Sequence, residues 1–254
     1  MRPYPDLVHP RAWLACVAWF VATSALAGCA SPAQRAPSPA RLVPVYADTA
    51  QLRVGAQQVV NAFVAEVTRA RGVPLGTAPT AHVRNTPQLI FFNGQQNQIV
   101  VPWWATAAPE MHGVFRSFAG GSDADAEYLF RAFFNGFLIA HEAGHWFQSN
   151  ARQRSATLYE SENMANRFAV AFWRTQPNGE ALLGELERLA ATAFANLQDP
   201  TPAGEDPVAY FGANYQALGR EPLKYGYYQF RFMRDAIRDR SQLDFAKMVS
   251  GPPR

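Results

Sequence analysis

The chain has 254 residues, and its 23 Lys and Arg against 20 Asp and Glu give a formal net charge of only +3. Such a small charge, without a stretch that combines clustered basic and exposed aromatic residues, argues against a nucleic-acid-binding protein. The two cysteines, Cys16 and Cys29, both lie near the N-terminus. We expect Cys16 to be removed with a signal sequence, which excludes an internal disulfide, thiol catalysis and cysteine-ligated zinc.

The N-terminal segment has the features of a secretion signal. An apolar run at 12–26 is about fifteen residues long, whereas a membrane-spanning helix needs about 20. The run ends in Leu26-Ala27-Gly28-Cys29, which resembles the lipobox of bacterial lipoproteins. This resemblance implies that residues 1–28 are a signal peptide and that Cys29 carries the lipid. An ordinary secretory signal with a stray cysteine, or an uncleaved anchor, is the alternative.

The next segment predicts a tether followed by one domain. Ala30 follows the cysteine, and by resemblance to Gram-negative lipoproteins this implies the periplasmic side of the outer membrane rather than the inner membrane. Residues 29–47 are rich in Pro, Ala and Ser and lack apolar periodicity, so we expect them to link lipid and domain. The remaining residues 48–254 are enough for a single domain with a sizeable core.

The first elements of that domain are a helix and two strands. Asp48 or Thr49 can cap a helix that runs to Arg71, because its apolar residues recur at helical spacing. Apolar, β-branched and aromatic runs at 89–92 and 99–101 flank a turn-forming stretch. They predict two strands that can form a hairpin.

Helices dominate the rest of the chain. After a loop at Gly120-Gly121, Asp123 or Asp125 can cap a long helix. Residues 199–212 contain three prolines and two glycines and predict a loop. Further helices are expected at 157–175, 179–197, 222–239 and 241–249, the last beginning at Ser241. The predicted fold class is therefore α+β, mostly helical with a small sheet.

The long helix carries the motif His141-Glu142-Ala143-Gly144-His145. Its two histidines are four residues apart, so they share one face of a helix and can converge on one zinc ion. Glu142 can then act as a general base toward a water whose pKa the zinc lowers to about 7. Gly144 is expected to keep the helix surface low where substrate approaches. The His-Glu-x-x-His pattern is typical of zinc metalloproteases.

The residues around the motif indicate a buried helix. Two histidines and a glutamate inside such a helix need polar partners or a metal. Two hydrogen-bonded core histidines are the alternative, which leaves Glu142 unexplained. The apolar neighbours are Phe133, Phe134, Phe137, Leu138, Ile139, Trp146 and Phe147.

A catalytic zinc site needs a third protein ligand and one open position. His82 and His112 lie upstream in predicted loops. On the next predicted helix, Glu162 and Asn166 are four residues apart, so Glu162 can bind zinc while Asn166 accepts a hydrogen bond from a ligand histidine. Glu160 is the rival third ligand, unless it is a solvated carboxylate that the helix dipole favours in the first turn.

These residues also carry a family resemblance. His-Glu-x-Gly-His at 141–145, followed by Glu-x-x-Ala-Asn-x-Phe-Ala at 162–169, resembles the ImmA/IrrE-type metallopeptidases and, more broadly, the zincins whose third ligand is glutamate. The resemblance implies a zincin-like domain with an active-site helix, Zn2+ held by His141, His145 and Glu162, and Glu142 as the base. Such zincins often have Asp where Asn166 stands, and ImmA/IrrE-type enzymes are cytoplasmic.

Other residues are weaker candidates for substrate binding. Zincins commonly lay an extended substrate along an edge strand, and 89–92 or 99–101 could serve, unless both are ordinary core strands. Tyr225 and Tyr228 are candidates for stabilising an oxyanion, although tyrosines near phenylalanines more often pack in a core. The pair Trp103-Trp104 is expected to pack rather than to bind substrate.

The sequence thus predicts a lipid-anchored, zinc-dependent hydrolase that cleaves peptide bonds in the cell envelope. Its partners would be a peptide or protein substrate and the membrane that receives the lipid. A catalytically idle zinc-binding lipoprotein that serves as a scaffold for an envelope partner is the alternative from another class. Cleavage of peptidoglycan cross-links differs from the first hypothesis only in its substrate.

Overall fold

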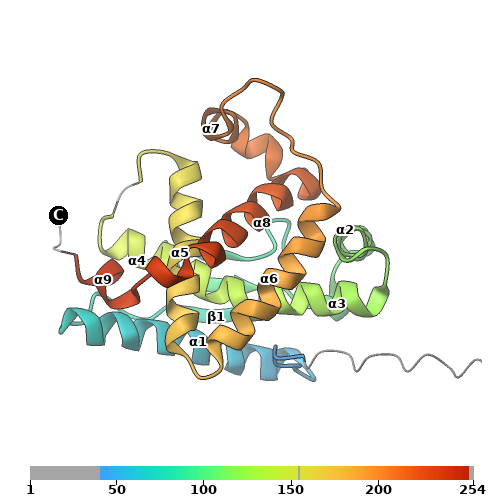
Figure 1. Ribbon diagram of the computed structural model, residues 1–254. Helices are drawn as coiled ribbons and strands as arrows, with labels where there is room; N and C mark the ends of the chain where they lie inside the picture. The colour runs from blue at the N-terminus through green and yellow to red at the C-terminus, as the bar shows by residue number, and fades with distance from the viewer. Residues whose placement is uncertain (1–40, 154, 252–254) are drawn as a thin grey trace, which may run out of the picture. The chain divides into compact units, whose positions relative to one another are not determined.

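A computed structural model describes residues 41–153 and 155–251 (Figure 1). The predicted signal peptide, Cys29 and residues 29–40 of the predicted tether lie outside the described residues. The described residues belong to one compact unit, which begins at Arg41. Its described part is mostly helical with one three-stranded sheet, so the expected α+β class is confirmed.

The compact unit includes residues 41–47, which the sequence assigned to the tether. Val43 is buried in the core, and the Leu42 backbone N–H donates to the carboxylate of Glu185 at 2.9 Å. The Arg41 guanidinium lies 4.3 Å from the centre of the Tyr128 ring. One apolar side chain and one buried acceptor thus hold the segment, and neither produces a periodic pattern in the sequence.

The first helix, α1 (Thr49–Arg71), has the predicted boundaries. The Asp48 side chain caps it by accepting a hydrogen bond from the Gln51 N–H at 2.8 Å. Gly72 ends it with a φ of 72°, a conformation that glycine adopts without steric cost. The helix buries its apolar face in the core and lies along the bottom of Figure 1, under the sheet.

The sheet has the order β1-β3-β2. β2 (Phe91–Asn93) and β3 (Gln98–Val101) are antiparallel, which confirms the predicted hairpin. β1 (Thr80–Val83) pairs in parallel with β3 and was not predicted, because four residues give too short a pattern. His82 therefore lies in a strand and not in a loop. β1 and β2 both form edges of the sheet.

A second element absent from the prediction is α2 (Pro109–Ala119), which follows the short helix η1 (Trp104–Thr106). His112 lies in α2 rather than in a loop. Its ring stacks on Trp104 with a centroid distance of 4.0 Å, and Trp104 also packs against Phe130. Trp104 is thus a packing residue, as expected.

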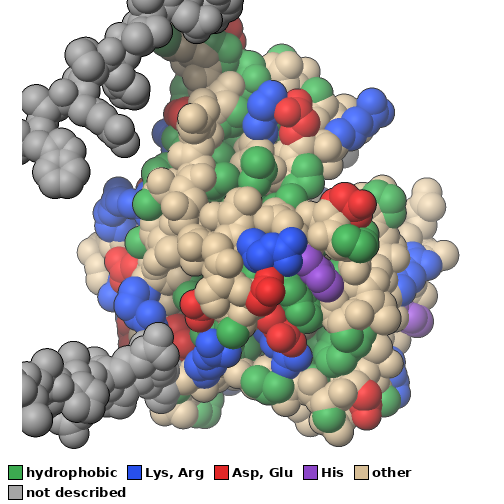
Figure 2. Space-filling view, turned by 90° about the vertical axis from the view of Figure 1, so that its right-hand side faces the viewer, with side chains coloured by type: hydrophobic (Ala, Val, Ile, Leu, Met, Phe, Trp, Pro, Cys, Tyr) green, Lys and Arg blue, Asp and Glu red, His purple; other side chains and the backbone are tan. Residues whose placement is uncertain are grey.

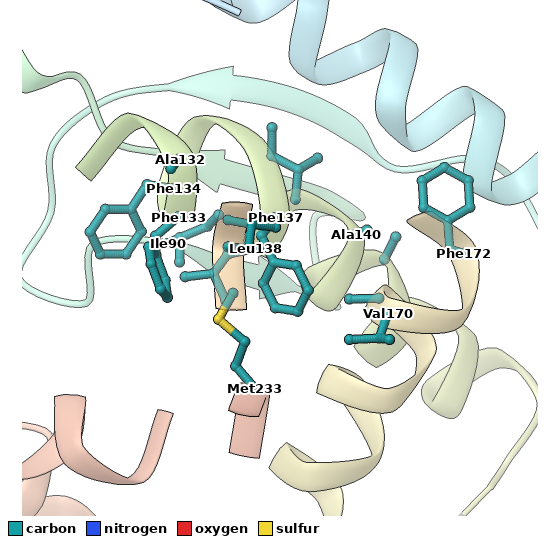
Figure 3. Close-up of a cluster of buried hydrophobic side chains, with 14 of the residues drawn as sticks. Ile90, Ala132, Phe133, Phe134, Phe137, Leu138, Ala140, Val170, Phe172 and Met233 are labelled. Atoms are coloured by element: carbon teal, nitrogen blue, oxygen red, sulfur yellow. The ribbon is translucent and has the colours of Figure 1, made fainter. Parts of the chain in front are cut away.

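The predicted long helix consists of three consecutive parts. α3 (Asp123–Ala132) is followed by η2 (Phe133–Phe137), one turn of π-helix, and by α4 (Leu138–Asn150), which carries the motif. The cap of α3 is Ser122, whose side chain accepts a hydrogen bond from the Asp125 N–H, so neither predicted aspartate caps the helix. Phe133, Phe137 and Leu138 point into the cluster of buried side chains in Figure 3.

The first of the remaining helices packs against α4, and the other α-helices pack against that helix. The predicted loop at 199–212 is wrong in its second half, because Asp206 caps a helix that begins at Pro207. The last helix is capped by Asp244 and begins at Phe245 instead of Ser241. Together the elements are α5 (Leu158–Thr175), α6 (Gly179–Ala195), α7 (Pro207–Leu218), α8 (Pro222–Arg238), η3 (Arg240–Gln242) and α9 (Phe245–Ser250).

Two groups of buried apolar side chains hold these helices. The larger is the main core, to which most elements contribute. The smaller, called here the aromatic cluster, consists of Phe211, Leu218, Tyr227, Tyr228 and Phe232, from α7 and α8. On the surface, Lys and Arg lie interspersed with Asp and Glu on the face shown in Figure 2.

Candidate metal centre

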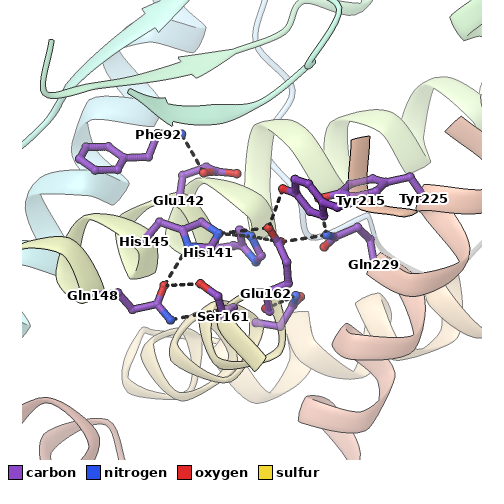
Figure 4. Close-up of polar contacts among 11 residues, drawn as sticks. Phe92, His141, Glu142, His145, Gln148, Ser161, Glu162, Tyr215, Tyr225 and Gln229 are labelled. Carbon is purple, nitrogen blue, oxygen red and sulfur yellow. Dashed lines mark hydrogen bonds and ion pairs between the residues drawn. The ribbon is translucent and has the colours of Figure 1, made fainter. Parts of the chain in front are cut away.

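Two neighbouring helices bring three side chains to one point. His141 and His145 extend from α4, and Glu162 extends from α5 (Figure 4). The two Nε2 atoms are 3.1 Å apart, Oε2 of Glu162 is 3.3 Å from His141 Nε2, and Oε1 is 3.8 Å from His145 Nε2. Tetrahedral ligands about 2.1 Å from a zinc ion are separated by about 3.4 Å. The group therefore fits one metal ion with little movement.

Close packing between α4 and α5 sets this arrangement. A Cβ on Gly144 would lie 3.3 Å from Cα of Ala165 and 3.3 Å from Cβ of Phe168. Gly144 thus faces the neighbouring helix, and the expectation that it clears space for substrate is wrong. Because Glu162 lies one turn before Ala165, this close approach is what brings the third side chain to the histidines.

Burial and charge act together on the group. The side chain of His145 is 22% exposed, whereas those of His141 and Glu162 are 3% and 11% exposed. Burial alone would raise the pKa of Glu162, but hydrogen bonds from both histidines hold that pKa well below its usual range. Burial would lower the pKa of His145, but Glu162 opposes this and raises it to about 9. Without a metal, the two groups therefore form an ion pair.

The Nδ1 atoms of His141 and His145, which face away from the point of convergence, differ in their surroundings. Nδ1 of His145 is 2.8 Å from Oε1 of Gln148, and the Gln148 amide donates to the Ser161 carbonyl at 3.2 Å. Nδ1 of His141 is buried and has no hydrogen-bond partner among the described residues. Gln148 lies one turn beyond His145 on the same face of α4, a spacing that could have identified it in the sequence.

The predicted contact from Asn166 to a ligand histidine is not formed. Its amide nitrogen donates instead to the backbone carbonyl of Glu162 at 3.0 Å, a bond within the helix that polar side chains often make. Its Oδ1 is buried and, within the described part of the chain, has no partner.

Glu142 connects the group to the sheet. Its Oε2 accepts a hydrogen bond from the Phe92 backbone N–H at 2.8 Å (Figure 4). Burial raises the pKa of Glu142, and the neighbouring histidines partly offset this. Since this N–H points to Glu142, it faces away from β3 and lies on the outer edge of β2.

Glu160 lies apart from His141, His145 and Glu162. Its carboxylate accepts hydrogen bonds from the N–H groups of Ala156 at 2.9 Å and Thr157 at 3.2 Å. The Thr157 hydroxyl in turn accepts from the Glu160 N–H at 3.1 Å, so the two residues form a capping box at the start of α5. The structure places Glu162, and not Glu160, beside the histidines.

The tyrosine nearest to the group is one that the sequence did not indicate. The Tyr215 hydroxyl, from α7, donates to Oε1 of Glu162 at 3.2 Å, and burial raises its pKa to about 12. Tyr225 is connected to Glu162 through Gln229, whose amide donates to the Tyr225 hydroxyl at 3.0 Å. Tyr228 is in the aromatic cluster, where its hydroxyl is 2.7 Å from that of Thr201. Tyr215 was missed because it lies just beyond the segment predicted as a loop.

Gln229 of α8 is the other group that the sequence did not indicate. Its Nε2 donates to Oε2 of Glu162 at 3.0 Å. Helices α7 and α8 thus each supply one donor to the same carboxylate (Figure 4).

Solvent reaches the group beside His145. A polar cavity of about 480 Å³ opens there, between the end of α4 and the start of α5. Its lining side chains are His145, Gln148, Ser149, Arg152, Gln153 and Ser161. The cavity explains why His145 is the most exposed of the three converging side chains.

Comparison of the chain with protein-family models, with curated proteins and with solved structures finds no match. In the described part of the chain, no helix combines the length and the apolar character needed to cross a bilayer.

Proposed function

We propose that the protein is a zinc-dependent hydrolase that cleaves peptide bonds, with Glu142 as the general base. The observation that carries the proposal is the convergence of His141, His145 and Glu162 beside the buried carboxylate of Glu142. Two imidazoles and one carboxylate are a ligand set typical of catalytic zinc, which keeps a fourth position open. A zinc-binding scaffold would have no need of a base next to the metal.

The proposed chemistry uses each group in one role. His141, His145 and Glu162 would hold Zn2+, which as a Lewis acid would lower the pKa of a bound water molecule to about 7. Glu142 accepts the proton of the attacking water, and the raised pKa of its buried carboxyl suits it to hold that proton and deliver it to the leaving amine. The Phe92 N–H keeps the carboxylate in place.

Tyr215 is the residue that we propose as donor to the developing oxyanion. Its hydroxyl lies beside the ligand group, and its pKa of about 12 keeps it protonated at neutral pH. A preorganised donor of this kind contributes about 3–4 kcal/mol to transition-state stabilisation. This role replaces the one expected for Tyr225 or Tyr228.

The substrate is proposed to lie along β2. This strand is an edge of the sheet, and the outward orientation of the Phe92 N–H brings that edge to Glu142. An extended peptide can add to such an edge through main-chain hydrogen bonds. The zincin-like fold, the lipid at Cys29 and an outer-membrane location facing the periplasm complete the proposal, and they rest on the sequence resemblances given above.

The test is the Glu142→Ala variant of the full chain, purified in detergent. Hydrolysis of envelope proteins and of purified peptidoglycan would be followed by mass spectrometry, and zinc would be measured in the same samples. We expect hydrolysis to be lost while zinc is retained, because Glu142 is not a ligand. Unchanged hydrolysis would contradict the mechanism, and the two substrate types distinguish a peptidase from an enzyme that opens cross-links.

A further inference from the structure

The carboxylate of Glu162 has a separate donor on each oxygen. Oε1 accepts from Tyr215 at 3.2 Å, and Oε2 accepts from the Gln229 amide at 3.0 Å (Figure 4). The same Gln229 nitrogen lies 3.0 Å from the Tyr225 hydroxyl. Helix α8 therefore presents an amide nitrogen, fixed between two oxygens, to the third ligand of the proposed metal centre.

The orientation of Gln229 is set by Glu162. Only the nitrogen of an amide can donate, so the nitrogen must face the carboxylate. This orientation leaves Oε1 of Gln229 buried and without a hydrogen-bond partner among the described residues. An unsatisfied buried carbonyl costs free energy, so the contact with Glu162 must outweigh that cost.

We propose that Gln229 is a positioning residue of the metal centre, which holds one oxygen of Glu162 so that the carboxylate presents a single oxygen to the metal. The inference rests on the proposed metal function. A carboxylate held in this way leaves the fourth coordination position open, whereas a freely turning one can bind through both oxygens and fill it. Gln229 touches neither substrate nor metal in this account and acts only through Glu162.

The test compares two glutamines in the full chain. Gln229→Met keeps the side-chain length but removes the donor, and Gln216→Met changes an exposed residue of α7 as the control. We expect Gln229→Met to raise the Kd for zinc by about 10- to 100-fold, the effect typical of outer-shell partners, and Gln216→Met to leave it unchanged. Zinc affinity would be measured by competition with a chromophoric chelator.

A second measurement reports coordination directly. The visible absorption of bound Co2+ weakens when its coordination number rises above four. We expect it to weaken in Gln229→Met and in Gln229→Asn, whose shorter amide stays polar but cannot reach Glu162. If both variants give the same spectral change, a folding defect in one of them does not explain it.

The outcomes separate this inference from the proposed function. Wild-type zinc affinity and an unchanged Co2+ spectrum in both Gln229 variants would overturn the positioning role alone. A wild-type chain that takes up neither metal would overturn the metal centre and this inference with it.

Discussion

The proposed metal centre has two sides that differ in how they are built. On one side, α4 and α5 pack tightly in the main core, with Gly144 against Ala165, and they carry the converging ligands. On the other side, α7 and α8 supply Tyr215 and Gln229, and α7 is held through the smaller aromatic cluster. The difference teaches that one tightly packed helix pair carries the converging side chains, whereas the donors to Glu162 come from two other helices, α7 in the aromatic cluster and α8 in both that cluster and the main core.

The largest expected effect lies on the α4–α5 side. Glu162→Ala removes a ligand, so zinc affinity should fall by about a thousandfold or more, as measured by competition with a chelator. Glu160→Ala is the matched control, which should keep the affinity and lose only about 1 kcal/mol of stability with its capping box. Loss of zinc in the control, or its full retention in Glu162→Ala, would reverse the assignment of the third ligand.

The α7 side should affect rate more than binding. Tyr215→Phe removes the proposed oxyanion donor, so kcat should fall by about 100- to 1,000-fold. Because the same hydroxyl also donates to Glu162, zinc affinity should fall by about tenfold at most. Tyr210→Phe, on the same helix, is the control and should change neither quantity. If zinc were lost from Tyr215→Phe while the rate per bound zinc stayed constant, Tyr215 would be a second positioning group.

The tight contact between α4 and α5 can be tested without touching a ligand. Gly144→Val would force the helices apart, because even a Cβ at this position comes within 3.3 Å of Ala165. We expect the free energy of unfolding to fall by about 1–3 kcal/mol and the zinc affinity to fall about tenfold. Gly184→Val, in a helix position with open space around it, should leave zinc affinity unchanged. Equal effects at both positions would show that the contact does not set the ligand geometry.

The last expected effect concerns pH. A metal ligand must be a neutral imidazole, but in the metal-free protein His145 has a pKa of about 9 and holds a proton below it. Zinc must displace this proton, so its apparent affinity should rise by at most about tenfold per pH unit as the pH approaches 9. Titration calorimetry in buffers of different ionisation enthalpy measures the released proton. A zinc affinity that does not change between pH 6 and 9 would contradict the ion pair between His145 and Glu162.

The sequence predicted the parts of this molecule that have a local pattern. Each of these parts depends on residues that are close together in the sequence: the cap and apolar face of α1, the hairpin of β2 and β3, and the histidine spacing on α4. It missed β1, which has only four residues, and α2, whose N-cap Ala108 makes no side-chain hydrogen bond. It also missed Tyr215 and Gln229, which reach Glu162 only through tertiary packing. The role of Gly144 was misjudged for the same reason, since its neighbour lies on another helix.

The central claim is that His141, His145 and Glu162 bind zinc. Elemental mass spectrometry of the full chain, purified without a histidine tag, tests it most directly. The account predicts about one zinc per chain, because three ligands converge on a single point. A chain that contains no zinc, even after reconstitution, would contradict the account and leave the motif as a buried polar cluster.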